Sequence, residues 1–296
     1  MNSNTRSISY ICLILILAIS GCHSVQNLTN DENSFSDVIV PKEPIMLFNG
    51  KDLSGFYTWL GDFHYEDPYN VFSVVDRIDG ASAIRISGEH WGGLVTKDHY
   101  AQYHLIVEYR WGLATWGERK DRARDSGILI HAEGPDGNFQ ADFNSPWMRS
   151  IEFQIMEGAT GDFILLGGYT DEGERIPTRL TVKSSRDRKG AYRWDPVDGE
   201  SRQFDVGPRN WSGINWYGRD PDWEDVIDFK SVYDLENPIG QWNRLEIYSN
   251  ENDLTYLVNG RIVNKGTTED LKEGKILFQS EGAEVFFRRI ELHPLQ

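Results

Sequence analysis

The chain has 296 residues, a formal net charge of −16 and only two cysteines. The acidic balance argues against a nucleic-acid partner, because binding to phosphates requires clustered Lys and Arg. A domain of roughly 250 residues is large enough to form one hydrophobic core without disulfides. The 12% aromatic content suits a β-rich domain and equally a surface on which sugar rings stack.

The N-terminal segment has the pattern of a secretion signal. Arg6 supplies a positive charge, and residues 8–19 are apolar but fewer than the roughly 20 residues that cross a membrane. Small residues precede Cys22, as at the cleavage site of lipoprotein signal peptidase. We therefore predict a lipoprotein signal peptide over residues 1–21, a lipid anchor at Cys22 and a location at the bacterial cell envelope. Cleavage would also remove Cys12, which leaves no disulfide.

Residues 22–44 are polar and without pattern, which is typical of a flexible tether between lipid and domain. We expect the folded domain to cover residues 45–296. Short runs of strand length, separated by Gly, Asn, Asp and Pro, follow one another there without a sustained helical period. This pattern predicts an all-β domain.

Two runs alternate cleanly between apolar and polar faces. In residues 103–111 the odd positions are apolar or aromatic, and in residues 150–157 Ile151, Phe153 and Ile155 share one face. Further strands are expected over residues 83–88, 127–132, 180–183, 242–249, 254–258, 261–264, 275–279 and 285–293. Asn259-Gly260 predicts a tight hairpin turn between two of them.

This many antiparallel strands in one domain predict a two-sheet antiparallel β-sandwich. Each strand then buries one face between the sheets and presents the other to the outside. Residues 167–237 contain few strand candidates and are rich in Asp, Arg, Gly, Pro and Trp. A stretch this long indicates a functional loop or inserted hairpins over a sheet.

Seven short motifs, in this order, carry a resemblance to a known family. They are Leu47-Phe48-Asn49-Gly50-Lys51-Asp52-Leu53-Ser54-Gly55, Asp125-Ser126-Gly127-Ile128-Leu129-Ile130-His131, Ser150-Ile151-Glu152-Phe153-Gln154-Ile155, Gln241-Trp242-Asn243-Arg244-Leu245, Asn259-Gly260, Phe278-Gln279-Ser280-Glu281-Gly282 and Val285-Phe286-Phe287-Arg288-Arg289-Ile290. The chain resembles the 3-keto-disaccharide hydrolase domain family from about residue 45 to residue 295. The resemblance implies a concanavalin A-like jelly roll that cleaves glycosidic bonds in sugars oxidised at carbon 3. Family members commonly have Asn in place of Asp125, which leaves open whether this residue is a ligand or a loop residue.

Cleavage of a sugar oxidised at carbon 3 requires particular chemical groups in the site. A ketone at carbon 3 acidifies the proton on carbon 2, so a base can remove it and the group on carbon 1 can leave; water then adds back. The site needs a base with a pKa near neutrality, donors for the enolate oxygen and an acid for the leaving group. We predict His131 as the base and Glu152 and Arg110 as its catalytic partners. A histidine held at a strand end and a solvated strand face are the alternatives for His131 and Glu152.

Several residues are candidates for substrate binding. Gln154 shares the outward strand face of Glu152, and Glu108 shares a face with Arg110, although an ion pair among Glu108, Arg110 and Glu152 would explain the same pattern. Trp91 and Trp147 lie in loops where an indole can stack on a sugar or be buried under the rim. The place of Lys97, Gln279 and Glu281 in the family motifs adds them to the candidates.

A divalent metal ion is the one cofactor the sequence leaves open, with His131, Glu152 and Glu157 as candidate ligands, although their spacing is not diagnostic. The sequence has no dinucleotide-binding motif. The 3-keto sugar would therefore come from a separate sugar 3-dehydrogenase. A non-catalytic carbohydrate-binding module and a conventional glycoside hydrolase or polysaccharide lyase are the competing interpretations.

Overall fold

The computed structural model describes residues 37–295, and the predicted signal peptide, Cys22 and most of the predicted tether lie outside these residues. Within the described part, strand pairing begins at Ile39, which bridges to Tyr100, earlier than the domain start expected at residue 45. The one helix among residues 37–295 is a 3₁₀ turn, η1 (Gly117–Arg119). No helix in this range is long and apolar enough to cross a membrane.

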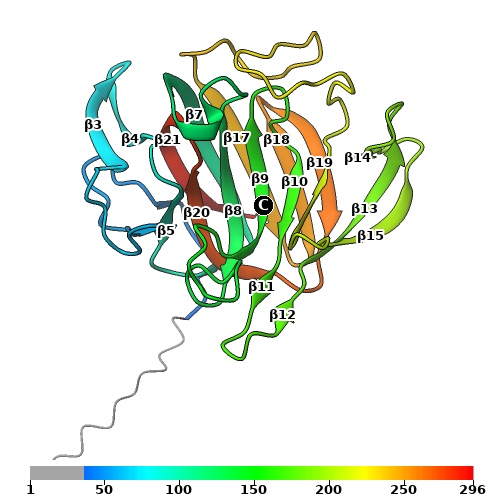
Figure 1. Cartoon of the computed structure of the whole chain (residues 1–296), viewed down its shortest axis with the longest axis horizontal. Coiled ribbons are helices and arrows are strands. Elements are labelled where there is room, and N and C mark those ends of the chain that lie inside the picture. Colours follow the sequence, from blue (N-terminus) through cyan, green and yellow to red (C-terminus); the bar gives the residue numbers. More distant parts are fainter. Residues whose placement is uncertain (1–36, 296) are drawn as a thin grey trace, which may run out of the picture. The chain divides into compact units, whose positions relative to one another are not determined.

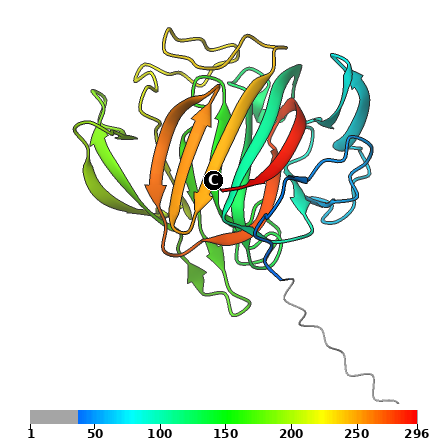
Figure 2. The same cartoon turned by 180° about the vertical axis from the view of Figure 1, so that it is seen from behind.

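Two large antiparallel sheets make up the domain, and Figures 1 and 2 view them from opposite sides. The 11-stranded sheet has the order β14 (Tyr192–Trp194), β13 (Arg179–Arg186), β19 (Arg261–Thr267), β18 (Asp253–Val258), β17 (Asn243–Asn250), β7 (Tyr103–Thr115), β21 (Ala283–Pro294), β4 (Ala81–Ile86) and β3 (Phe72–Ile78), with β1 (Ile45–Met46) beside β21 and β15 (Glu200–Asp205) beside β13. The 8-stranded sheet has the order β16 (Trp211–Ile214), β10 (Phe163–Leu166), β9 (Arg149–Met156), β8 (Asp125–Glu133), β20 (Glu273–Ser280), β5 (Gly92–Thr96) and β2 (Phe56–Leu60), with β6 (Tyr100–Ala101) beside β20. A separate two-stranded ribbon joins β11 (Gly168–Tyr169) and β12 (Arg175–Ile176). This arrangement confirms the predicted all-β sandwich of jelly-roll type.

The hydrophobic core lies between the sheets and follows the predicted alternation. The odd residues of β7 from 103 to 111 are buried in it, and so are Ile151, Phe153 and Ile155 of β9. Phe153 stacks on Tyr256 of the opposite sheet, with 4.4 Å between ring centroids. The even residues of β9 therefore face outward, which brings Glu152 and Gln154 to the outer surface of the 8-stranded sheet.

The turn and loop predictions have different outcomes. Asn259 and Gly260 have φ values of 49° and 80°, as the predicted hairpin turn requires. Residues 167–237 contain β11 to β16 and extend both large sheets at one side. A strand-free segment follows, from residue 217 to residue 241, and is drawn in yellow at the top of Figure 1. The alternative of inserted hairpins therefore describes most of this stretch.

The structure does not place His131, the predicted base, on the outer face of the sheet. Strict alternation from Leu129 would place it there, but a β-bulge lies between Ile130 and Glu133, and His131 itself has a φ of 53°. Its side chain is fully buried, with Nδ1 2.9 Å from the Leu271 carbonyl oxygen and Nε2 3.1 Å from Ser249 Oγ on the other sheet. Burial lowers the pKa of His131 to about 4, so the ring is neutral in the native protein.

This burial predicts a dependence of stability on pH. An unfolded histidine takes up a proton below its ordinary pKa of 6.5, whereas folded His131 does so only near pH 4, so acid favours unfolding. Between pH 7 and pH 5 the native protein should lose about 2 kcal/mol more than a His131→Asn variant, whose amide can still donate to Leu271. Urea unfolding of both proteins at the two pH values measures the difference. Equal losses would show that His131 does not carry this dependence.

Candidate active site

A hollow of about 660 Å³ lies on the outer face of the 8-stranded sheet. Its floor consists of side chains from β8, β9, β10, β16 and β20, and its rim includes Trp147 and Trp223 from loops. Hollows of this size commonly hold small ligands when a few polar groups converge in them. Five of the residues predicted for the site line it, namely Trp147, Glu152, Gln154, Gln279 and Glu281.

Gly127 creates the deepest part of this floor. It lies on β8 between Gln154 of β9 and the position of Gln279 on β20. A Cβ atom at Gly127 would come within 2.2 Å of Glu152 Oε1 and 3.0 Å of Gln279 Oε1. The two polar groups thus occupy the space that a side chain at position 127 would fill. Both oxygens are buried, and neither has a hydrogen-bond partner within residues 37–295.

Apolar neighbours surround the Glu152 carboxyl group. Glu152 pairs with Leu129 on one side and Ile164 on the other, and Leu277 lies next to Leu129 in the same row. Leu129 and Leu277 belong to a second apolar cluster, on the outer face of this sheet. Burial, and then the charge of Glu281, raise the pKa of Glu152 well above its usual value. Glu152 therefore holds its proton more strongly than an ordinary carboxyl group does.

Arg119 joins the other carboxyl groups at this end of the hollow. It forms an ion pair with Asp125, lies 3.7 Å from Glu281 and contacts Asp225 at 3.2 Å. Burial raises the pKa of Glu281 to about 7, although Arg119 opposes the rise. Burial likewise raises the pKa of Asp125, again against Arg119. This end of the hollow thus combines the guanidinium of Arg119 with three carboxyl groups that cannot all be ionised together.

Gln154 fixes the Asp125 side chain. Its Nε2 donates a hydrogen bond of 2.7 Å to Asp125 Oδ1, so both side chains are held in place across adjacent strands. Asp125 is 1% exposed and lines the hollow, which settles that it is not a loop residue.

A second ion pair borders the opposite side. Arg219 pairs with Asp162, whose Oδ1 also accepts a 2.7 Å hydrogen bond from the backbone of Trp216. Burial raises the pKa of Asp162 to about 6, and Arg219 opposes the rise. The guanidinium of Arg219 also lies 4.5 Å from the ring centroid of Trp223. These contacts hold residues 215–223 against the hollow.

Aromatic side chains provide flat surfaces at the rim. Trp211 is 45% exposed and lines the hollow. Trp147 is largely buried and lines it too, while Trp91 stacks beside Trp147 with ring centroids 6.2 Å apart. Trp91 itself lies outside the hollow, in a smaller side hollow of about 290 Å³.

Arg110 and Glu108 lie elsewhere, because they belong to the outer face of the other sheet. Arg110 donates to Asp79 at 2.8 Å and lies over Trp242. Glu108 accepts a 2.7 Å hydrogen bond from Arg288, its cross-strand neighbour on β21. Both residues are therefore cross-strand or surface partners rather than parts of the hollow, and Arg110 does not lie beside Glu152 as its predicted catalytic role would require.

Lys97 is also outside the hollow: its Nζ donates to the Ser54 carbonyl oxygen at 2.8 Å. Glu157 forms a buried ion pair with Arg124, with an N–O distance of 2.7 Å. The candidate metal ligands His131, Glu152 and Glu157 therefore do not converge. Within residues 37–295, no three His, Cys, Asp or Glu side chains are grouped as ligands of one metal ion.

Sequence reasoning missed the two arginines and Asp162. Sequence reasoning also left the role of Asp125 open. Alternation along β8 puts Asp125 on the same strand face as Gly127, and this pattern could have identified it as a site residue. Arg119 and Arg219 lie in loop segments without periodicity, and only the folded chain brings them to the sheet.

The close approach at Gly127 predicts the effect of one methyl group. In Gly127→Ala the new Cβ displaces the Glu152 and Gln279 side chains, so ligand binding and turnover should each fall at least about tenfold while the fold persists. Gly213→Ala is a matched control in the same hollow, since its Cβ comes closest to the tip of Ile164, at 3.2 Å, and meets no other atom nearer than 3.8 Å. Calorimetric titration and thermal unfolding of both variants measure this. Equal behaviour of the two variants would contradict the assignment of the floor.

Comparison with known proteins gives the family. Residues 43–293 match the model of the 3-keto-alpha-glucoside-1,2-lyase-like domain. No curated protein matches the sequence.

Three solved structures share the general outline of the chain. A candidate glycosyl hydrolase from Parabacteroides distasonis is 18% identical, with 86% of this chain and 94% of that chain covered and a TM-score of 0.44. A β-glucanase from Bacillus licheniformis is 11% identical, with coverage of 85% and 97% and a TM-score of 0.41. A carbohydrate-binding module from Bacillus subtilis is 8% identical, with coverage of 80% and 94% and a TM-score of 0.39. Similarities this low carry no inference about activity.

The family match covers nearly all of the described domain and includes every residue of the hollow's floor. The chain belongs to the family of 3-keto-alpha-glucoside-1,2-lyase-like domains, and is thereby a carbohydrate-active protein.

Proposed function

We propose that the hollow binds a 3-keto-glycoside and cleaves its glycosidic bond by proton abstraction at carbon 2, elimination and hydration. The observation that carries the proposal is the pair of carboxyl groups at its floor. Both Glu152 and Glu281 line the hollow, burial raises the pKa of Glu152 well above its usual value, and the pKa of Glu281 is raised to about 7. Two carboxyl groups with raised pKa values in one hollow are suited to give and take protons, which is what acid–base catalysis of an elimination needs.

In this mechanism Glu281 takes the proton from carbon 2. The electron pair of that C–H bond forms the enolate, and the bond from carbon 1 to the glycosidic oxygen then breaks. Glu152 gives its proton to the departing oxygen. Water next adds its oxygen to carbon 1 and gives a proton to the Glu152 carboxylate, while Glu281, after exchange with solvent, returns a proton to carbon 2. Both residues regain their starting states, and the net reaction is hydrolysis.

Other side chains supply position and charge. The Gln279 amide oxygen faces the space over Gly127, where it can accept a hydrogen bond from a sugar hydroxyl. Arg119 acts as a positioning residue, because it holds Asp125 and Glu281 by ion pairs. Trp147 and Trp211 offer ring faces on which the sugar can stack.

The choice of substrate can be tested directly. The purified protein is incubated with a disaccharide and, separately, with the same disaccharide oxidised at carbon 3, and release of the second sugar is followed by chromatography. We expect cleavage of the oxidised form alone. Cleavage of both forms would indicate a conventional glycoside hydrolase, and binding without cleavage would indicate a carbohydrate-binding module.

The acid–base assignment predicts a pH profile. Because Glu281 accepts a proton only when ionised, kcat/KM should rise with pH through about 7, and Glu281→Gln should remove this limb. Glu152→Gln should lower kcat by about 10²- to 10⁴-fold. Glu108→Gln is a control on the other sheet and should retain full activity. A Glu152→Gln variant with unchanged kcat would refute the role of this residue.

We further propose that the protein is anchored to the cell envelope through a lipid on Cys22 and acts after a separate sugar 3-dehydrogenase. In a bacterial host, Cys22→Ala should carry no fatty acid and should keep its signal peptide, because lipid attachment and cleavage both need the cysteine. Cys12→Ala should be lipidated and cleaved normally. Incorporation of radiolabelled palmitate and migration on immunoblots measure this, and a lipidated Cys22→Ala variant would disprove the anchor.

A further inference from the structure

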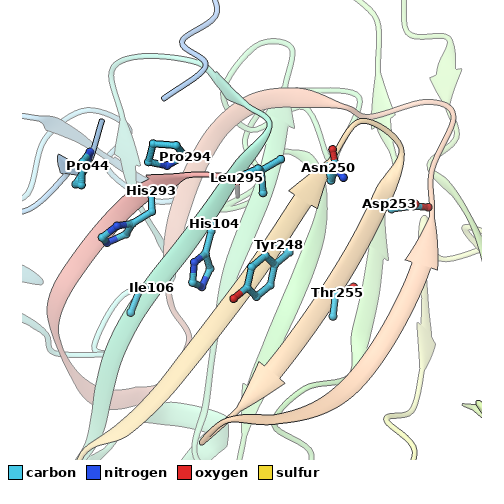
Figure 3. A pocket seen from close by; sticks show the side chains of 10 residues that line it. All are labelled: Pro44, His104, Ile106, Tyr248, Asn250, Asp253, Thr255, His293, Pro294 and Leu295. Carbon is cyan, nitrogen blue, oxygen red and sulfur yellow. The ribbon is translucent and has the colours of Figure 1, made fainter. Parts of the chain in front are cut away.

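A second hollow, of about 800 Å³, lies on the outer face of the 11-stranded sheet and is larger than the candidate active site. We refer to it as the back hollow. Figure 3 shows its lining, which comprises Pro44, His104, Ile106, Tyr248, Asn250, Asp253, Thr255, His293, Pro294 and Leu295. The two hollows share no lining residue, so the back hollow is separate from the acid–base chemistry.

Aromatic rings form a row across its floor. His293, His104 and Tyr248 are direct cross-strand neighbours on β21, β7 and β17. The rings of His104 and Tyr248 are stacked, with centroids 3.9 Å apart and planes 11° apart. One face of Tyr248 is therefore covered by His104, while the other is turned toward Thr255, its neighbour on β18 (Figure 3). Tyr248 is 37% exposed and lines the back hollow, so a ligand there can reach part of its ring.

Carboxylates one row away hold the histidine rings in place. His104 Nε2 lies 2.8 Å from Glu246, and Arg244 donates to the same carboxylate at 2.9 Å. His293 Nε2 lies 2.9 Å from Glu291 in the same manner. The ring surface is thus fixed before any ligand arrives, which lowers the entropy cost of binding.

Polar groups lie beside the open face of Tyr248. Asn250, Asp253 and Thr255 come from the β17–β18 hairpin, and the Asn250 side chain makes no hydrogen bond within the described residues. Asp253 accepts a 3.0 Å hydrogen bond from Thr267 and has a second carboxylate oxygen to offer. A flat apolar face bordered by amide, carboxylate and hydroxyl groups matches a pyranose, which has an apolar C–H face and a rim of hydroxyls.

The charges in the back hollow select against anionic ligands. None of its lining residues is Lys or Arg, and Asp253 adds a negative charge. Burial lowers the pKa of His104, so its ring is uncharged at pH 7. Phosphates, acidic glycans and nucleic acids would meet no cation in this hollow.

We propose that the back hollow is a second glycan-binding site, which takes an uncharged sugar ring against Tyr248 with Asn250 and Asp253 as hydrogen-bond partners. It would hold the protein on a polysaccharide while the opposite sheet acts on its own substrate. This site does not depend on the reaction proposed for the candidate active site.

Affinity gel electrophoresis of the full chain tests the proposal. The gels contain a soluble uncharged polysaccharide, namely β-glucan, starch, xylan or mannan in turn. At least one should retard the protein, and Tyr248→Ala should weaken that retardation about tenfold in affinity. Tyr233→Ala removes an exposed tyrosine elsewhere and should leave retardation unchanged, as should Glu152→Gln in the other hollow. Asn250→Ala provides a second variant should Tyr248→Ala unfold.

Three outcomes would overturn the proposal. One is that none of the four polysaccharides retards the protein. Another is that retardation survives both Tyr248→Ala and Asn250→Ala but is lost in Glu152→Gln, which would place glycan binding in the other hollow. The third is a dimer in sedimentation velocity that Tyr248→Ala dissociates in the absence of glycan binding, which would make this face an interface between two copies of the chain.

Discussion

Burial of three carboxyl groups beside a single arginine is the constraint on which the candidate active site depends. Asp125, Glu152 and Glu281 are withdrawn from water at one end of the hollow, with Arg119 as the cation that contacts two of them. Removing carboxylates from water costs several kcal/mol each, and one positive charge does not compensate for three negative ones. The cluster therefore retains protons at neutral pH. These bound protons do not stabilise the fold, but they give the site a proton donor and a proton acceptor at the same pH.

The sandwich supplies what this cluster needs. Apolar neighbours on the outer face, among them Leu129 and Leu277, keep water away from Glu152. Gly127 leaves room above the sheet for its carboxyl group, and rigid pairing on β8, β9 and β20 fixes the distances. The loop that carries Arg219 closes the other side. An antiparallel sheet with one face in the core and the other face hollowed is thus enough to hold acid–base chemistry without any contribution from helices.

The sequence was sufficient for the layers and for part of the site. Alternation in residues 150–157 correctly placed Glu152 and Gln154 on the outer face, since a strand buried on one side must show its other side to solvent. The same rule failed at His131, because a bulge adds a residue that periodicity does not register. For Arg110 the rule gave the correct outward direction, but Arg110 lies on the 11-stranded sheet, whereas Glu152 lies on the 8-stranded sheet. Alternation assigns a face of a strand, whereas the choice of sheet and the approach of loop residues such as Arg119 depend on long-range pairing.

The proposed mechanism requires that the proton at carbon 2 is removed and replaced during each turnover. In the proposed mechanism Glu281 removes this proton, and the hydration step returns one from solvent. Turnover in deuterated water should therefore place deuterium at carbon 2. Nuclear magnetic resonance of the sugar released from a 3-keto-disaccharide measures the incorporation. The account predicts about one deuterium at carbon 2 for each bond cleaved, a stoichiometry that follows from acid–base exchange with water. Cleavage that leaves the original hydrogen at carbon 2 would contradict it.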